Sequence, residues 1–264
     1  MSRRLPLVLS LAATGALLVR TYRKAKNVER LAAAVLETLL NAIEANDPAT
    51  GMHLRRTAAR ALVIADAAGL DAAGQAAVER VALFHDIGKI YGALFDIIHG
   101  KSKLTETQRK TVLTHPAVGA NVLAPLATFY PQLPQGVLSH HECWDGSGYP
   151  RRLRGSRIPI EARITAIADT FDAVAQTRSY RRGRGPDVAL EVIEQGRGTQ
   201  FDPELVDLVL LPPVANRIAN IRLSRRMLHG RRRSHEHEEV PDISFRWRAP
   251  SLSPRGIPAM GRVD

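Results

Sequence analysis

The sequence predicts an all-α protein with a single core, on three observations. Aromatic residues make up only 5% of the 264 residues. Ala, Leu, Val and Ile recur at helical spacing, which favours helices packed through small aliphatic side chains over sheets of β-branched and aromatic residues. The length suits one substantial domain with extensions. We therefore expect a single helical core.

Composition also narrows the class of protein. Cys143 is the only cysteine, so an intramolecular disulfide is excluded and a reducing compartment is favoured. The net charge of +11 is concentrated near the two ends, without the interleaved aromatic residues of a nucleic-acid groove. We do not expect nucleic acid as a partner.

The first segment, residues 1–26, combines basic residues with an apolar run. Arg3 and Arg4 precede the run at residues 5–19, and Arg20 follows it. As a helix the run would rise about 22 Å, against about 30 Å for a bilayer core. A short membrane anchor, a signal peptide cleaved near Ala16 and an amphipathic leader are the alternatives. We expect the anchor, in the inner membrane with the catalytic part in the cytoplasm, because basic residues flank both ends. The alternative is a soluble cytoplasmic protein.

Residues 27–45 are predicted to form a helical connector. Leu31, Val35, Leu39 and Ile43 fall four apart and form an apolar stripe. Such a stripe can pack on the core or pair with a second copy of the chain, so a homodimer is one expected assembly.

The catalytic domain is expected at residues 46–211. Asp47 and Pro48 form an N-cap followed by a first-turn proline, which predicts a helix from there to about Ala67. His53 lies nearly two turns into this helix. Taken alone, it is either a metal ligand or an ordinary structural histidine.

A second helix, starting at Asp71, ends in the adjacent pair His85 and Asp86. Burying two polar side chains at the end of an apolar helix is costly unless they are paired or bind a metal. A nitrogen next to a carboxylate suits first-row transition metals, manganese included. Gly88 then allows the backbone to turn.

Further polar residues of the same types follow. A capping box opened by Thr105 predicts a helix before His115. His140 and His141 stand together before a turn-rich loop, and Asp169 interrupts an otherwise apolar helix face. Each residue has an ordinary structural explanation, but their combination favours a metal site.

The combined motifs resemble the HD-GYP phosphodiesterases, a branch of the HD phosphohydrolase superfamily. Gly148, Tyr149 and Pro150 give that family its second name. The similarity covers about residues 46–211, at segments 85–89, 140–142, 144–150, 158–159, 162–164, 169, 178, 180–181 and 198–203. The resemblance implies an HD-domain helical bundle extended by the GYP region.

The resemblance also implies an activity. Family members hydrolyse cyclic di-GMP to pGpG or GMP with two divalent metal ions, usually iron or manganese, through a hydroxide that bridges them. Some members hold a third metal through a glutamate four residues before the first histidine, where this chain has Ala49. The metal ligands implied are His53, His85, Asp86, His115, His140, His141 and Asp169.

Other roles carried by the resemblance concern the substrate and partners. Lys89 matches the family lysine near the scissile phosphate, where it can act in catalysis together with Asp86; its ordinary alternative is a solvated surface lysine. Arg178 and Arg181 match positions that hold substrate phosphate or guanine. The GYP loop at 148–150 is expected to shape the pocket and to contact a signalling partner.

Two departures from the family pattern widen the choice of function. Residues 90–104 lack the family's prolines, and Ser179 replaces another proline. The altered segment follows Lys89, so an HD hydrolase acting on another nucleotide is the second hypothesis. A non-catalytic signalling scaffold that uses the GYP surface is the third.

The remainder, residues 212–264, is predicted to be a basic, largely disordered tail. Pro212 and Pro213 end the last core helix, and the following sequence is rich in Arg and Pro. The segment 235–239 alternates His and Glu; a solvated charged stretch is favoured there over weak metal binding.

Overall fold

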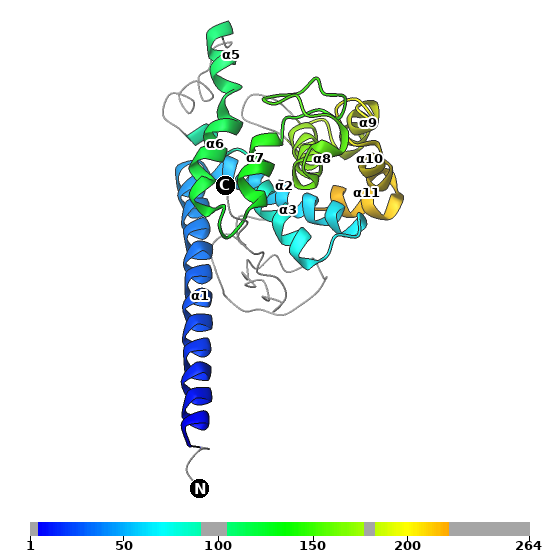
Figure 1. The fold of residues 1–264 in the computed structure, drawn as a ribbon. Coiled ribbons are helices and arrows are strands. Elements are labelled where there is room, and N and C mark those ends of the chain that lie inside the picture. The colour runs from blue at the N-terminus through cyan, green and yellow to red at the C-terminus, as the bar shows by residue number, and fades with distance from the viewer. Residues whose placement is uncertain (1–4, 91–104, 177–182, 222–264) are drawn as a thin grey trace, which may run out of the picture. The chain divides into compact units, whose positions relative to one another are not determined.

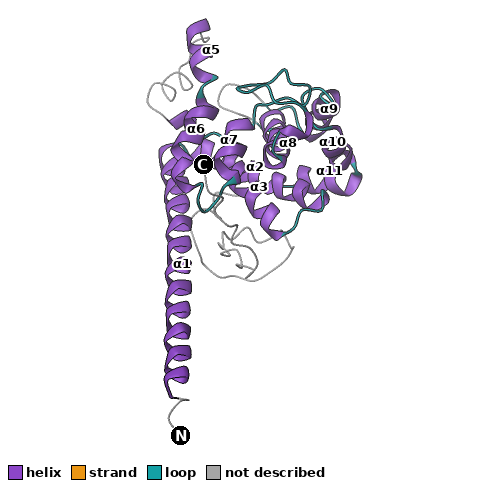
Figure 2. Ribbon diagram, in the orientation of Figure 1, coloured by secondary structure: helices purple, strands orange, loops and turns teal. Residues whose placement is uncertain are grey.

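The computed structural model describes residues 5–90, 105–176 and 183–221. The described residues divide into two units, with the boundary between Ala34 and Val35. Every regular element of the described ranges is a helix, as Figure 2 shows, which confirms the all-α prediction. The elements, labelled in Figure 1, are α1 (Leu5–Asn46), α2 (Pro48–Ala67), α3 (Ala72–Phe84), η1 (Ile87–Ile90), α5 (Glu106–Val112), α6 (His115–Leu123), η2 (Ala124–Leu126), α7 (Gln132–Ser139), η3 (Gly155–Arg157), α8 (Ile160–Ala175), α9 (Pro186–Gln195), α10 (Pro203–Leu210) and α11 (Pro212–Ala219).

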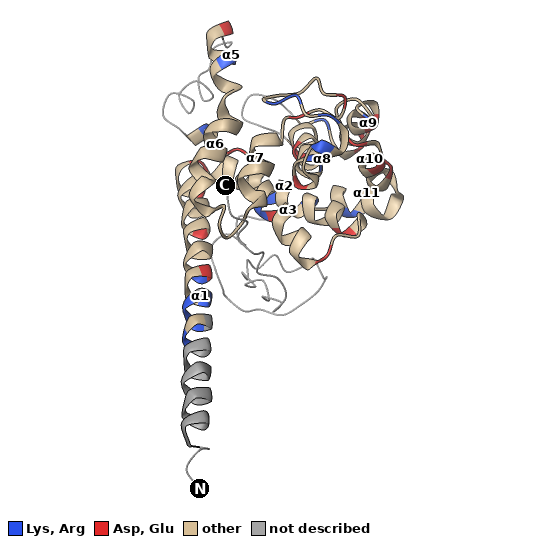
Figure 3. Ribbon diagram, in the orientation of Figure 1, with Lys and Arg blue, Asp and Glu red and all other residues tan. Residues whose placement is uncertain are grey.

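α1 is one continuous helix across the segments predicted as anchor and connector. Only Gly15 interrupts its run of helix-compatible residues after Pro6. Basic side chains cluster along its middle, and acidic ones follow toward its C-terminal end (Figure 3).

The membrane anchor predicted for residues 1–26 is not supported. Within the described part of the chain, no helix has the length of apolar sequence needed to cross a membrane. The physical reason is the length of the apolar run. It ends at residue 19, before the charged residues Arg20, Arg23 and Lys24, so as a helix it is about 22 Å long, shorter than the bilayer core of about 30 Å.

The apolar stripe predicted on residues 27–45 is also shifted. Leu31 and Val35 are 65% and 41% exposed, whereas Leu36, Leu40 and Ile43 are buried. The buried face therefore lies about one residue further along the helix than a strict four-residue spacing predicted, because 3.6 residues make one turn.

α2 begins and ends as predicted. The Asp47 carboxylate accepts from the Ala49 amide at 2.9 Å and from the Thr50 hydroxyl at 2.6 Å, so it satisfies donors that the first helical turn leaves free. The same device recurs at α3, where Asp71 accepts from the Gly74 amide, and at α5, where Thr105 forms the predicted capping box.

The core of the larger unit forms where α2 and α3 pack on each other and on α8, with α7 against α3 and α6 against α7. Small aliphatic residues dominate these contacts, as predicted from the composition. Fully buried side chains include Leu54, Ile64, Val78, Val81, Ala82, Ile164, Ile167, Ala168 and Phe171.

One boundary differs from the prediction. Pro212 and Pro213 do end α10, but they also begin α11, which buries Val214 and Ile218. Proline is well tolerated in a first helical turn, where its missing N–H has no partner in any case. Residues 212–219 thus belong to the helical unit, and residues 222–264, including the His and Glu residues at 235–239, lie outside the described ranges.

Candidate metal centre

Seven side chains predicted from the sequence converge in the larger unit. They come from the second turn of α2, the residues directly after α3, the start of α6, the residues directly after α7 and the middle of α8. They form two groups, and within each group one ligand atom per residue lies within 4.8 Å of the others. The first group is Asp86, His115, His140 and His141, and the second is His53, His85 and Asp169.

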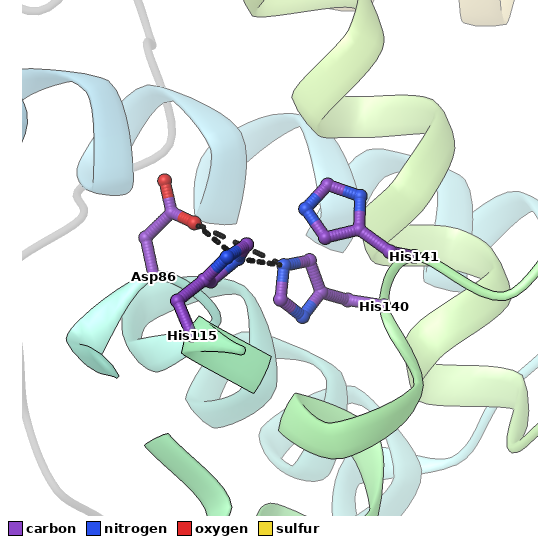
Figure 4. Close-up of side chains that lie close together, drawn as sticks. All are labelled: Asp86, His115, His140 and His141. Atoms are coloured by element: carbon purple, nitrogen blue, oxygen red, sulfur yellow. Dashed lines mark hydrogen bonds and ion pairs between the residues drawn. The ribbon is translucent and has the colours of Figure 1, made fainter. Parts of the chain in front are cut away.

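Figure 4 shows the first group. The Oδ1 atom of Asp86 lies 3.3 Å from Nε2 of His115 and 3.8 Å from Nε2 of His140. His141 lies beside His140, with ring centroids 4.1 Å apart. One carboxylate and three imidazoles therefore face a common point.

Backbone carbonyls fix the orientation of three imidazoles. Nδ1 of His85, His115 and His140 lies 2.9, 2.8 and 2.6 Å from the carbonyl oxygen three residues earlier. A carbonyl can only accept, so Nδ1 carries the proton and Nε2 presents a lone pair. This is the tautomer in which a histidine binds a metal through Nε2.

The consequence is clearest between His115 and His140. Their Nε2 atoms are 3.2 Å apart, although both Nδ1 atoms hold the ring proton. Two lone pairs at this distance repel each other unless a positive charge lies between them. The pair is therefore suited to a cation.

The second group is joined to the first through Asp86. Nε2 of His53 lies 3.2 Å from Oδ1 of Asp169, and Nε2 of His85 lies 3.8 Å from the same oxygen. Nε2 of His85 is also 3.5 Å from Oδ2 of Asp86. Asp86 thus directs one oxygen toward each group.

Lys89 contacts the carboxylate of Asp86. Its Nζ donates to Oδ2 of Asp86 at 2.6 Å, and its side chain is about one-third exposed. The family resemblance implies a position for Lys89 near the reacting phosphate, and in the structure its ammonium lies at the edge of the predicted centre.

The charges of the centre are strongly perturbed by burial. Burial lowers the pKa of His85 and of His140, and it lowers the pKa of His141 to about 4. For Asp86, burial acts to raise the pKa, but Lys89 and the neighbouring histidines outweigh it and the pKa is lowered. Neutral imidazoles facing an ionised carboxylate are the protonation states that metal binding requires.

His53 is the exception among the imidazoles. Burial acts to lower its pKa, but the adjacent carboxylates of Asp169 and Asp172 outweigh burial and raise the pKa to about 9. Two carboxylates flank this ring, so positive charge is stabilised there, whether it is carried by a proton or by a bound cation.

Unsatisfied buried atoms point to the same occupant. Within the described residues, Nε2 of His53, Nε2 of His85 and Oδ1 of Asp86 are buried without a hydrogen-bond partner. Leaving such atoms unpaired costs about 1–3 kcal/mol each. A divalent cation fits a set of imidazole nitrogens and carboxylate oxygens, so the donor set suits a metal.

Gly88 positions the start of α6 against this centre. A Cβ atom at residue 88 would lie 2.1 Å from the carbonyl oxygen of His115 and 2.8 Å from the amide nitrogen of Gly119. The prediction that Gly88 serves a turn is therefore incomplete, because it is also needed for the close approach of two backbones.

The GYP loop supports the centre from one side. The ring of Tyr149 stacks on His141, with centroids 4.9 Å apart and an interplanar angle of 17°. The buried carboxylate of Glu142 accepts from the backbone amides of Arg151 and Leu153 at 2.7 and 2.9 Å. The loop therefore holds one predicted ligand in place.

Gly146 and Gly148, just before and at this loop, are needed for different reasons. Gly146 has φ of 84°, whereas Gly148 is absent from the described positive-φ residues. Gly148 is required for another reason: its Cβ would lie 2.2 Å from the amide nitrogen of Cys143.

Sequence reasoning missed three polar residues behind His53. Asp172 accepts from His53, Arg56 and Arg60, and both Asp172 and Arg60 are fully buried. Their spacing was a usable signal: Arg56 and Arg60 lie three and seven residues after His53 on α2, and Asp172 lies three after Asp169 on α8.

Some predicted residues have no described position. Arg178, Arg181 and the segment after Ile90 that departs from the family pattern lie outside the described ranges. Ala49, which stands where a third-metal glutamate would be, is exposed on α2, and Asp47 caps that helix.

With this fold and this cluster, the chain belongs to the HD domain family, whose model matches residues 37–205. Among curated proteins it is 37% identical over 193 residues to the cyclic di-GMP phosphodiesterase response regulator RpfG of Xanthomonas campestris, covering 72% of this chain and 50% of that protein. It is 37% identical over 174 residues to 3'3'-cGAMP-specific phosphodiesterase 2 of Vibrio cholerae, covering 65% of this chain and 33% of that protein. The HD-GYP resemblance is thereby confirmed, and the chain spans half or less of the length of these two relatives.

Solved structures support the fold. A cyclic GMP-AMP-specific phosphodiesterase of V. cholerae matches with a TM-score of 0.50 at 22% identity, covering 71% of this chain and 53% of that chain. The HD domain of the L. monocytogenes phosphodiesterase PgpH, solved with cyclic di-AMP, matches with a TM-score of 0.50 at 19% identity, covering 75% of this chain and all of that domain.

Proposed function

We propose that this chain is a metal-dependent phosphodiesterase that hydrolyses cyclic di-GMP to pGpG or GMP. The observation that carries the proposal is the convergence of seven imidazole and carboxylate ligands, with three imidazoles locked in the Nδ1–H form that directs Nε2 inward. The relatives' cyclic-dinucleotide activities supply the substrate class.

Two divalent ions, iron or manganese, would be held by the two groups. His115, His140 and His141 would hold one ion and His53, His85 and Asp169 the other, and Asp86 presents an oxygen to each group. When bound, such ions activate water and neutralise the phosphodiester oxygens. Ala49 supplies no ligand for a third ion.

The chain's own residues supply the rest of the chemistry. Lys89 lies 2.6 Å from Asp86 at the partly exposed edge of the centre, where its ammonium can stabilise developing phosphate charge or protonate the departing 3′-oxygen. Tyr149 keeps His141 in position through ring stacking. Arg178 and Arg181 are proposed to hold the substrate's phosphate or guanine.

A second candidate substrate is another cyclic dinucleotide, 3'3'-cGAMP. It is favoured by one observation: the cGAMP-specific relative and the cyclic di-GMP relative are equally identical to this chain, at 37%. The alternative of a non-catalytic scaffold is disfavoured, because all seven ligand positions are occupied by residues able to bind a metal.

The test is hydrolysis by the full chain after anaerobic loading with Fe²⁺ or Mn²⁺. Cyclic di-GMP, 3'3'-cGAMP and cyclic di-AMP are supplied separately, and the products are resolved by chromatography. We expect cyclic di-GMP to be cleaved fastest. If 3'3'-cGAMP is cleaved faster, the second candidate replaces the first, and if metal binds without cleavage of any dinucleotide, the proposed function fails.

Asp86→Ala is the matched loss-of-function variant. It removes the oxygens that face both groups, so metal uptake and turnover should both disappear. Asp66→Asn serves as a control, because Asp66 pairs with Arg217 at the surface of α2, with both side chains about half exposed. Turnover that survives Asp86→Ala would contradict the proposed centre.

A further inference from the structure

A buried carboxylate lies behind the predicted metal centre and is not one of its ligands. Asp172 is on α8, one turn after Asp169, and its side chain has no exposed surface. Its Oδ2 lies 2.6 Å from Nδ1 of His53, on the side of the ring opposite the nitrogen that faces Asp169. A carboxylate accepts, so Nδ1 of His53 carries the proton.

This contact distinguishes His53 from the other imidazoles that have a fixed Nδ1. His85, His115 and His140 donate to neutral backbone carbonyls, whereas His53 donates to a charged carboxylate. An anionic acceptor makes the opposite nitrogen a stronger donor to a metal and holds the ring in one orientation. The two metal positions therefore have different supports.

Two guanidinium groups complete the surroundings of Asp172. Arg56 donates to it through Nε and Nη2 at 2.7 and 2.9 Å, and Arg60 donates through Nη1 at 2.6 Å. Arg60 is fully buried and lies over the ring of Phe171, 5.0 Å from its centroid. Together these two cations would oppose a metal ion at His53, and Asp172 offsets one of their two positive charges.

We propose that Asp172 is a positioning residue that sets the metal affinity of the His53, His85 and Asp169 position by acting through Nδ1 of His53. The inference rests on the proposed metal centre. In that centre, the position that includes His53 is supported by the charged Asp172, whereas the position that includes His115 and His140 is supported by backbone carbonyls. Asp172 itself is not one of the seven candidate ligands.

The experiment is calorimetric titration of the metal-free full chain with Mn²⁺, comparing wild type with Asp172→Asn. The amide keeps the shape of the side chain and removes its charge. We expect one of two ions to bind about 10- to 100-fold more weakly, as is typical when a supporting acceptor is lost, while the other binds as in wild type. Asp207→Asn, an exposed acid-to-amide change on α10, should leave both ions unaffected.

A double-mutant cycle tests whether Asp172 acts through His53. His53→Gln alone should weaken the same ion, and adding Asp172→Asn to it should cause no further loss. If Asp172→Asn weakens the remaining binding by the same factor in the His53→Gln background, its effect is general and the inference is overturned.

Arg56→Gln keeps the inference testable if Asp172→Asn does not fold. This change leaves the bond between Asp172 and His53 in place and removes a cation, so Mn²⁺ should bind as tightly as in wild type or more tightly. Weaker binding of either ion would overturn the inference.

Two failures remain distinguishable. Absence of Mn²⁺ uptake by the wild-type chain contradicts the proposed function itself. If two ions bind and each has the same affinity in Asp172→Asn as in wild type, only the role given to Asp172 is contradicted.

Discussion

Replacing Gly88 by alanine should damage both the stability of the helical unit and the metal centre. The added Cβ would lie 2.1 Å from the carbonyl oxygen of His115 and 2.8 Å from the amide nitrogen of Gly119. Both neighbours are backbone atoms of α6, so no side-chain rotation relieves the overlap. Restoring ordinary contact at about 3.4 Å requires a displacement of about 1.3 Å between η1 and α6.

The size of the effect follows from these distances. Overpacking of a rigid site typically costs about 1–3 kcal/mol, which lowers the Tm by about 2–12 °C for a unit of this size. His115 begins α6 and lies 3.3 Å from Asp86, whereas metal ligands tolerate only about 0.2 Å of misplacement. Mn²⁺ affinity should therefore fall together with the Tm.

Differential scanning calorimetry and Mn²⁺ titration measure the two consequences. Gly74→Ala is the control, because its Cβ would come no closer than 3.3 Å to its nearest neighbours, which are side-chain atoms of Leu70 and Asp71. Alanine is also favoured over glycine in a helix by up to about 1 kcal/mol. If Gly88→Ala has the same Tm and the same Mn²⁺ affinity as wild type, the inferred close contact between η1 and α6 is contradicted.

Three further changes test other contacts. Tyr149→Ala removes the ring that stacks on His141 and should weaken Mn²⁺ binding by about 2- to 13-fold, from about 0.5–1.5 kcal/mol of ring contact, whereas Tyr149→Phe should match wild type in the same titration. Equal affinity of the Ala and Phe variants would contradict a positioning role. Glu142→Gln should lower the free energy of unfolding in urea by about 1–3 kcal/mol, because a buried carboxylate that accepts two loop amides is replaced by a neutral amide with one acceptor oxygen. A loss below about 0.5 kcal/mol, which is no more than an ordinary surface substitution causes, would contradict this support of the loop by Glu142. Asp66→Ala should change stability by less than about 1 kcal/mol in the same assay, since its pair with Arg217 is half exposed, and a larger loss would show that the pair is not a simple surface contact.

Local signals in the sequence predicted α2 well. Asp47 and Pro48 mark its first turn, and a cap depends only on the few residues around it. The same holds for the capping box at Thr105. Proline was ambiguous at 212, because it ends one helix and begins the next with equal ease, and only the packing of Val214 and Ile218 identifies α11.

The candidate ligands were predictable for a different reason. Residues such as His85, Asp86 and Asp169 are expensive on apolar helix faces, so their presence there points to a bound partner without knowledge of the fold. The structure adds that they converge, with Nε2 of each of three imidazoles directed inward by a backbone carbonyl.

By itself, the sequence determined that the protein is helical and where its polar residues interrupt apolar helices, because helix signals and burial costs are local. Only the tertiary structure decided what those residues face. The contact of Asp172 with His53 joins positions 119 residues apart, and Gly88 meets the backbone of α6. Such contacts depend on how distant helices pack, which no short stretch of sequence contains.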